Sequence, residues 1–123
     1  MKKSLILSGN LVQDHEFIYP YYRLLEAGFD IDVALLGGEP VEGILKTRIP
    51  PNKDQAVISP DEVEVEKYQL LILPGGAKAM EYLRQDKTVL DIITNFYKKK
   101  ILIGSIWHGA QVLIAANIVK GKK

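Results

Sequence analysis

Four short apolar runs recur along this chain, and segments with helical periodicity separate them. The runs occupy residues 4–8, 29–36, 69–73 and 101–106, and Gly or Pro directly follows the first three. Short apolar runs bounded in this way are typical of strands that are buried on both faces of a parallel sheet. Because these strands alternate with helices, the pattern predicts an α/β fold. We expect a doubly wound parallel sheet with helices on both faces, an α/β/α sandwich.

The segments between the runs predict the helices that cover this sheet. In residues 17–27, four apolar side chains share one helical face: Phe17, Tyr21, Leu24 and Leu25. Pro20 suits the first turn of that helix, and Gly28 suits its C-terminal cap. Further helices are expected at residues 77–84, 88–99 and 108–116. Five residues of the second of these are expected to face inward: Val89, Ile92, Ile93, Phe96 and Tyr97.

Residues 39–60 contain four prolines and show only weak periodicity, so we expect an irregular segment there. Extended pieces are expected within it at residues 44–49 and 56–59, and residues 61–68 favour a short polar helix or turn. A chain of 123 residues is long enough for one hydrophobic core but not for two. The sequence therefore predicts a single domain over residues 1–123.

The composition excludes several classes of function. The formal net charge of +1 gives no reason to expect a nucleic-acid partner or a membrane surface. No segment approaches the eighteen or so apolar residues that span a bilayer, and the apolar run after the first lysines is too short for a signal peptide. The absence of cysteine excludes disulfides, thiolate metal sites and a cysteine nucleophile. We expect a cytoplasmic protein that uses no metal and no cofactor.

Three loops follow the carboxyl ends of the expected strands, at residues 9–16, 74–78 and 106–109. Ligands of doubly wound sheets bind at this edge, where the strand order switches. Gly75 and Gly76 leave backbone amides uncovered there, which suits a bound anion or oxyanion. The same pair also suits a tight strand-to-helix turn with a positive φ angle. No GxGxxG or P-loop spacing occurs, so the pattern does not favour a nucleotide site.

Residues 104–110 read as a strand that enters a helix through a sharp turn, the setting in which many enzymes hold a nucleophile. The turn here carries Trp107, whose indole has one N–H donor and no nucleophilic atom. His108 follows it and is either a general base or a structural residue at the sheet edge. Glu16, after the first strand, is either a functional acid or a carboxylate placed by the helix dipole, whereas His15 beside it is expected on the surface.

Taken together, Glu16, the turn 73–76 and the elbow 105–111 resemble the DJ-1/PfpI (ThiJ) superfamily, whose flavodoxin-like fold is shared with class I glutamine amidotransferases. The resemblance implies a cysteine at the elbow position, an acid at Glu16 that hydrogen-bonds the thiol, and oxyanion contacts from Gly75 and Gly76. It also implies an intracellular protease or amidase, a glyoxalase-type enzyme, a chaperone or a stress sensor. Many members of this superfamily form homodimers or larger assemblies.

This chain departs from that pattern at Trp107, which stands where the superfamily has its cysteine, so thiolate chemistry does not carry over. Members also normally continue with further strands and a closing helix, whereas this sequence stops at Lys123. We therefore expect a homo-oligomeric domain that acts through binding or assembly, with a small carbonyl or amide compound as its ligand. The alternative is an active enzyme that uses Glu16 and His108 as acid and base. A third alternative is an anion or nucleotide pocket.

Overall fold

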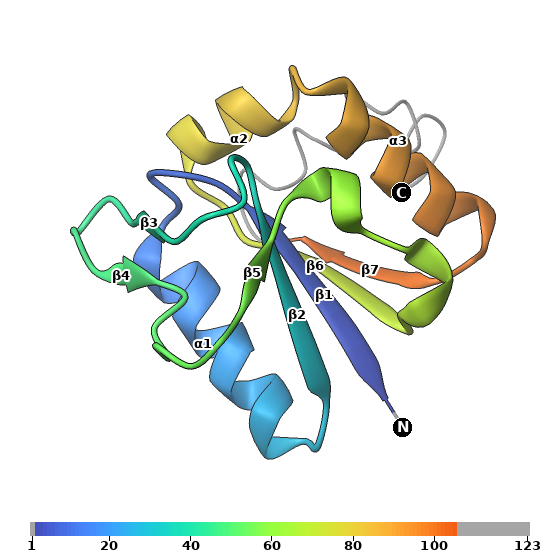
Figure 1. Ribbon diagram of the computed structural model, residues 1–123, viewed down its shortest axis with the longest axis horizontal. Helices are drawn as coiled ribbons and strands as arrows, with labels where there is room; N and C mark the ends of the chain where they lie inside the picture. Colours follow the sequence, from blue (N-terminus) through green and yellow to red (C-terminus); the bar gives the residue numbers. More distant parts are fainter. Residues whose placement is uncertain (1, 106–123) are drawn as a thin grey trace.

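The computed structural model describes residues 2–105, which form a five-stranded sheet in the order β5-β2-β1-β6-β7 (Figure 1). Every pair of neighbouring strands in it is parallel. The strands are β1 (Lys3–Ser8), β2 (Asp30–Leu35), β5 (Val57–Ile58), β6 (Leu70–Leu73) and β7 (Leu102–Ser105). Helix α1 (Asp14–Glu26) separates β1 from β2, and two further helices separate β6 from β7, whereas no helix lies between β2 and β5. The parallel sheet and its helices confirm the predicted doubly wound α/β class.

The order of the strands reverses between β1 and β6. From β1 the chain moves outward through β2 to β5, and it then returns to the other side of β1 with β6 and β7. Ligands of such sheets bind outside the carboxyl ends of the two strands at this switch point. Two of the predicted loops, residues 9–16 and 74–78, lie there. The third predicted loop, residues 106–109, falls outside the described residues.

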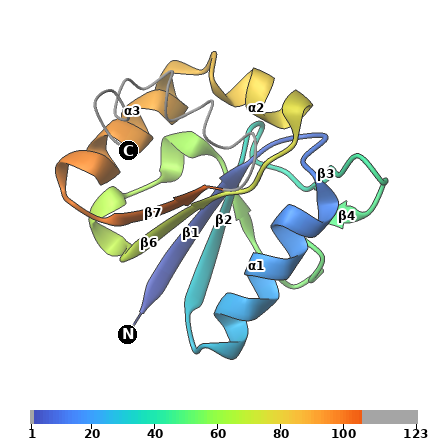
Figure 2. The same ribbon diagram turned by 180° about the vertical axis from the view of Figure 1, so that it is seen from behind.

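Helices cover the two faces of the sheet, as the view from behind shows (Figure 2). Helix α1 (Asp14–Glu26) lies against one face and contacts β2. Helix α3 (Lys87–Lys98) lies against the other face and contacts β7 and two short 3-10 helices, η1 (Pro60–Glu62) and η2 (Val65–Lys67). The short helix α2 (Ala77–Leu83) contacts β1. Among the described residues, no helix combines the length and the apolar character needed to cross a membrane.

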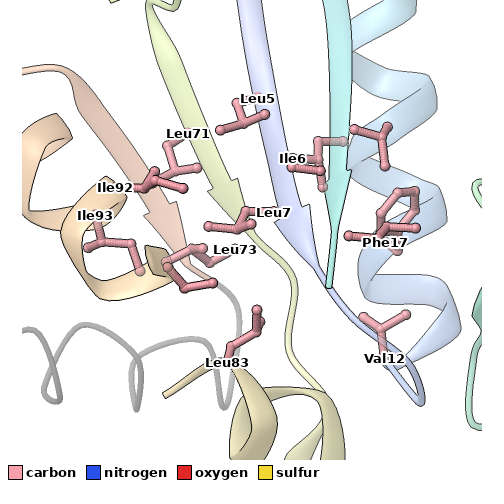
Figure 3. Packing of buried hydrophobic residues seen from close by; sticks show 14 of the residues in the cluster. Leu5, Ile6, Leu7, Val12, Phe17, Leu71, Leu73, Leu83, Ile92 and Ile93 are labelled. Atoms are coloured by element: carbon pink, nitrogen blue, oxygen red, sulfur yellow. The ribbon is translucent and has the colours of Figure 1, made fainter. Parts of the chain in front are cut away.

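The alternation of side chains along β1 divides the core between the two faces. Leu5 and Leu7 point toward α3, whereas Ile6 points toward Phe17 of α1 (Figure 3). All four side chains are fully buried. Burying one side chain of this size stabilises a fold by about 1.5–3 kcal/mol, so the three buried side chains of β1 contribute much to the stability of the sheet.

Helix α1 begins at Asp14, three residues before the predicted start. Acidic residues in its first turn, Asp14 and Glu16, favour this earlier start because the amino end of a helix carries partial positive charge. The expectation that Pro20 lies in the first turn was therefore wrong, and this residue lies inside the helix, where it has no N–H to donate to the Glu16 carbonyl. Leu25, which was expected on the buried face, is 39% exposed.

Helix α3 confirms the prediction for four of its five inward-facing residues. Val89, Ile92, Ile93 and Phe96 are buried, whereas Tyr97 is 41% exposed. Asp86 caps this helix, since its carboxylate accepts a hydrogen bond of 3.0 Å from the Val89 amide. Tyr97 directly follows the buried Phe96, so it lies at the margin of the apolar face of the helix and is only partly covered.

The segment that was predicted to be irregular contains a small antiparallel hairpin and β5, an edge strand of the main sheet. Strands β3 (Val41–Glu42) and β4 (Arg48–Ile49) form the hairpin, so only the end of the predicted extended piece 44–49 is a strand. Its first part is a turn closed by a 2.9 Å hydrogen bond from the Lys46 amide to the Gly43 carbonyl. The other predicted piece, residues 56–59, contains β5, which pairs with β2 at the edge of the sheet.

Candidate functional site

The loop after β1 and the glycine turn after β6 meet at the switch point. The Gln13 amide donates a hydrogen bond of 3.0 Å to the Gly75 carbonyl. Gly76 has a φ angle of 119°, and a Cβ atom built on it would stand 2.5 Å from the Gln13 amide nitrogen. Both the backbone conformation and this close approach require glycine at position 76. The turn therefore serves a structural need, and its predicted oxyanion role stays a prediction.

Glu16 lies on this side of the switch point, in the first turn of α1. Its amide donates a hydrogen bond of 3.0 Å to the carbonyl of Gln13, the residue whose amide is bonded to Gly75. The side chain is partly buried, and its Oε1 atom is buried with no hydrogen-bond partner among residues 2–105. Buried polar atoms without partners are rare in folded proteins, and they often mark functional sites. Glu16 is thus placed where its carboxylate can accept a hydrogen bond from a bound molecule. His15 beside it is exposed, as predicted.

Asp14 is a residue of this region that the sequence reasoning missed. It is the only fully buried carboxylate in the described part of the chain. Its Oδ1 accepts a hydrogen bond of 2.7 Å from the Leu45 amide, and its Oδ2 accepts one of 3.2 Å from the Thr47 amide and another from the Thr47 hydroxyl. Burial alone would raise the pKa of this carboxyl, but the hydrogen bonds from Thr47 and Leu45 outweigh it and hold the pKa below its ordinary value.

The hairpin is also bonded to the loop that leads into α1. The Leu11 amide donates a hydrogen bond of 2.9 Å to the Glu42 carbonyl, and the Ile44 amide donates one of 3.0 Å to the Val12 carbonyl. Leu11 has a positive φ angle of 64°, which is uncommon for a residue with a side chain. The loop 9–13 therefore lies between the hairpin on one side and the glycine turn on the other.

Strand β7 leads to the same edge of the sheet. Its last residue, Ser105, pairs with Leu73, the residue that precedes the turn Pro74-Gly75-Gly76. The predicted elbow residues Trp107 and His108 follow in the sequence and lie outside the described residues. The structure thus brings Glu16, Gly75 and Gly76 to one edge, and it does not test the placement of the other two.

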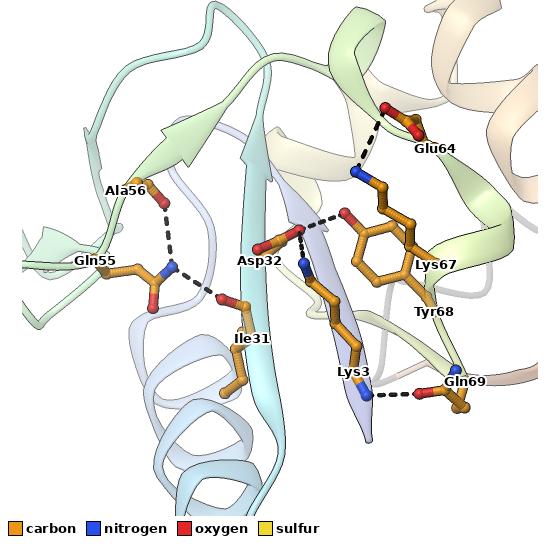
Figure 4. Close-up of polar contacts among 9 residues, drawn as sticks. All are labelled: Lys3, Ile31, Asp32, Gln55, Ala56, Glu64, Lys67, Tyr68 and Gln69. Carbon is orange, nitrogen blue, oxygen red and sulfur yellow. Dashed lines mark hydrogen bonds and ion pairs between the residues drawn. The ribbon is translucent and has the colours of Figure 1, made fainter. Parts of the chain in front are cut away.

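A second polar cluster lies at the opposite, amino-terminal edge of the sheet (Figure 4). Asp32 accepts a hydrogen bond of 2.6 Å from the Tyr68 hydroxyl, and its Oδ2 lies 3.3 Å from the Lys3 Nζ. Burial and the nearby charges of Asp32 and Glu64 raise the pKa of Tyr68, as does its hydrogen bond to Asp32. These contacts join β1, β2 and the end of η2, so we assign the cluster a structural role.

Neither a cavity nor a metal site was found at the switch point among the described residues. An open cavity of about 590 Å³ lies at the amino end of β7, and its lining includes Tyr97, Lys98, Lys100, Ile101, Leu102 and Ile103. It is at the end of the sheet opposite Glu16. Among residues 2–105, no group of three or more histidine or acidic side chains is arranged to hold a metal ion.

Comparison with known proteins agrees with the fold. The model of the DJ-1/PfpI family matches residues 2–123. Over 121 residues, or 98% of this chain, the sequence is 34% identical to the deglycase PfpI of Pyrococcus furiosus and 36% identical to a deglycase of Thermococcus kodakarensis. A two-domain crystal structure from Anabaena variabilis, with DJ-1/ThiJ/PfpI-like and ferritin-like domains, aligns over 96% of this chain with a TM-score of 0.84 and 27% identity.

The lengths of these proteins differ from that of this sequence. The chain spans 69% of each of the two deglycases and 33% of the Anabaena chain. None of its 123 residues is cysteine, which agrees with the substitution inferred at the elbow. The match to the family model nevertheless extends over nearly every residue, and it includes Glu16, both glycines of the turn and the elbow. The chain therefore belongs to the DJ-1/PfpI family.

Proposed function

We propose that this chain is a DJ-1/PfpI domain that binds a small carbonyl or amide compound at the switch point without cysteine chemistry. The observation that carries the proposal is the absence of any cysteine from the 123 residues, with Trp107 at the position of the family nucleophile. An indole cannot form the thiolate that attacks a carbonyl or is oxidised to a sulfenic acid. The chain retains the fold and has Glu16 at the position of the family's acid, whereas the cysteine nucleophile is missing.

The chemistry of Glu16 supports the choice of ligand. Its buried Oε1 has no donor among the described residues. A carboxylate accepts hydrogen bonds, so a matching ligand offers an N–H or O–H group. A primary amide and the hydrate of a small aldehyde both meet this requirement.

The binding proposal is tested by titrating the protein with methylglyoxal and with acetamide while recording the fluorescence of Trp107, the only tryptophan of the chain. We expect saturable quenching that Glu16→Gln abolishes. Glu26→Gln, at the exposed end of the same helix, is the matched control and retains the quenching. A wild-type protein that shows no saturable response to either compound would contradict the proposal.

The second candidate is an active enzyme in which Glu16 and His108 act as acid and base. The unpartnered oxygen of Glu16 also favours this candidate, and the curated relatives at 34% and 36% identity are named deglycases. The two candidates are separated by measuring deglycation of a methylglyoxal-treated amino acid with the wild type and with Trp107→Cys. Under our proposal only Trp107→Cys gains activity. Wild-type turnover that Glu16→Gln removes would establish the second candidate instead.

We further propose that the chain forms a homo-oligomer. Two tyrosines on the outer side of α1 support this, since Tyr19 is 67% exposed and Tyr22 is 44% exposed. Large exposed apolar side chains that neighbour each other on a helix are typical of contact surfaces. Light scattering coupled to gel filtration gives the mass directly, and we expect Tyr19→Lys to shift it toward that of a single chain. A wild-type protein of monomer mass would refute the proposal.

A further inference from the structure

Asp14 combines three properties that a structural residue at the start of a helix does not need together. It is negatively charged, it is fully buried, and both of its carboxylate oxygens accept hydrogen bonds from one distant loop. A helix start needs only an acceptor for its own first amides, and such an acceptor is normally exposed to solvent. Asp14 instead directs its carboxylate to residues 45 and 47, which lie more than thirty positions away in the sequence.

The loop of the hairpin is shaped around this carboxylate. A Cβ atom built on Gly43 would overlap the Asp14 carboxylate, so glycine at this position leaves room for the carboxylate. The Gly43 amide bonds the Thr47 carbonyl at 3.0 Å, and Lys46 between them has a positive φ angle of 68°. Because Asp14 accepts hydrogen bonds from Leu45 and Thr47 of this turn, the loop 43–47 and Asp14 form one unit, which we call the hairpin clamp.

The hairpin clamp is connected to the candidate site through the backbone. It holds the hairpin against the loop 9–13, to which the hairpin is bonded at Leu11 and Val12. The next residue of that loop, Gln13, is bonded to Gly75 through its amide and to the Glu16 amide through its carbonyl. Asp14 and Glu16 are two positions apart on α1, so their side chains leave the helix in different directions. Asp14 is therefore able to orient the first turn of α1 without lying in the site.

We propose that Asp14 is a positioning residue, which clamps the loop 43–47 onto the first turn of α1 and thereby sets the orientation of the Glu16 carboxylate. This inference rests on the proposed function in one respect only, namely that Glu16 is the residue that contacts the ligand. Loss of the clamp changes the site even though Asp14 touches no ligand.

The test measures Glu16 directly and uses no ligand, so it does not depend on whether the proposed function is correct. The side-chain carboxyl carbon of Glu16 is observed by ¹³C NMR, and the amides of Leu45 and Thr47 are followed by hydrogen exchange. In Asp14→Asn we expect those amides to exchange at least about tenfold faster, since the clamp no longer protects them. We also expect the Glu16 carboxyl resonance to move away from its wild-type position.

Further variants keep the inference testable if Asp14→Asn does not fold. Thr47→Val removes only the hydroxyl that Asp14 accepts from, and we expect it to move the Glu16 resonance in the same direction by a smaller amount. Thr47→Ser keeps the hydroxyl and is expected to restore the wild-type position. Asp54→Asn, at an exposed loop acid, is the control and leaves both signals unchanged. If Asp14→Asn or Thr47→Val speeds amide exchange while the Glu16 resonance stays in place, the clamp is purely structural and the inference is wrong.

Discussion

The Gly75 carbonyl and the Gln13 amide are joined by a 3.0 Å hydrogen bond that connects the two halves of the candidate site. The loop after β1 and the turn after β6 are separated by some sixty residues, and this contact holds them together. Gly76 beside it approaches the Gln13 backbone so closely that a side chain has no space. The precision of the switch point thus depends on backbone contacts.

Gly76→Ala is expected to destabilise the protein by at least about 2 kcal/mol, since it combines backbone strain with a clash against the Gln13 backbone. Gly28→Ala is the matched control. Gly28 also has a positive φ angle, 85°, but nothing lies within 4 Å of a Cβ placed there. The control is expected to cost only about 1 kcal/mol, from strain alone. Urea denaturation of both variants measures the difference, and equal losses would show that the close approach is unimportant.

Glu16→Gln is expected to leave the free energy of unfolding unchanged or to raise it by up to about 1 kcal/mol, because burying an unpaired carboxylate oxygen opposes folding. Functional residues commonly show this pattern, since they are kept at some expense to stability. Urea denaturation measures it, with Glu26→Gln as the reference. A large loss of stability in Glu16→Gln would instead show that this side chain has a structural partner.

The lowered pKa of Asp14 predicts how the free energy of unfolding changes at acidic pH. Its pKa is held below the ordinary value of 3.8 in the folded protein, so the unfolded chain takes up this proton first as the pH falls. The contribution of Asp14 is therefore complete above about pH 4 and is lost as the pH falls through the folded-state pKa. Asp14→Asn is expected to cost about 2 kcal/mol near neutral pH, as befits hydrogen bonds to a buried charge. It is also expected to flatten the acid limb of the stability profile.

Denaturant titrations between acidic and neutral pH, repeated for the wild type, Asp14→Asn and Asp54→Asn, provide the comparison. Asp54→Asn removes an exposed acid and is expected to follow the wild-type profile. If Asp14→Asn retained the full acid limb, the pH dependence would have to arise from other carboxyl groups.

The raised pKa of Tyr68 predicts a loss of stability at alkaline pH instead. Burial and the hydrogen bond to Asp32 raise its pKa above the ordinary value of 10, so the folded protein holds this proton more tightly than the unfolded chain does. Its contribution is complete below pH 10 and is lost as the pH rises toward the folded-state pKa. Tyr68→Phe is expected to cost about 1 kcal/mol at neutral pH, by loss of the hydrogen bond to Asp32.

The ionisation of the tyrosines is followed by near-ultraviolet absorbance during an alkaline titration, and stability is followed by denaturation at the same pH values. Tyr82→Phe, at a half-exposed tyrosine, is the control. We expect Tyr68→Phe to remove the last tyrosine to ionise before unfolding. If Tyr68→Phe instead removed a tyrosine that ionises near the ordinary value of 10, the assigned pKa shift would be contradicted.

Local sequence was sufficient for the elements and for part of the site. The runs around Leu5 and Leu71 are short and apolar, which is characteristic of strands buried on both faces, and the periodicity of Val89 to Phe96 matches the buried face of α3. The turn at Gly75 and Gly76 could be recognised because a positive φ angle strongly favours glycine. The predicted start of α1 was wrong because it placed Pro20 in the first turn, where proline is common, whereas this proline lies inside the helix.

The sequence by itself thus determined the α/β class, and it predicted which edge of the sheet holds the candidate site, with Glu16 and the glycine turn as its parts. Composition alone also shows that none of the 123 residues is cysteine, so none of them supplies a thiol nucleophile. Only the tertiary structure decided that β1 pairs with both β2 and β6, that Gln13 bonds to Gly75, and that Asp14 is enclosed by the loop 43–47. Local preferences are set by neighbours in the chain, whereas these contacts join residues about thirty to sixty positions apart. Their formation depends on how the whole core packs, and no local pattern records it.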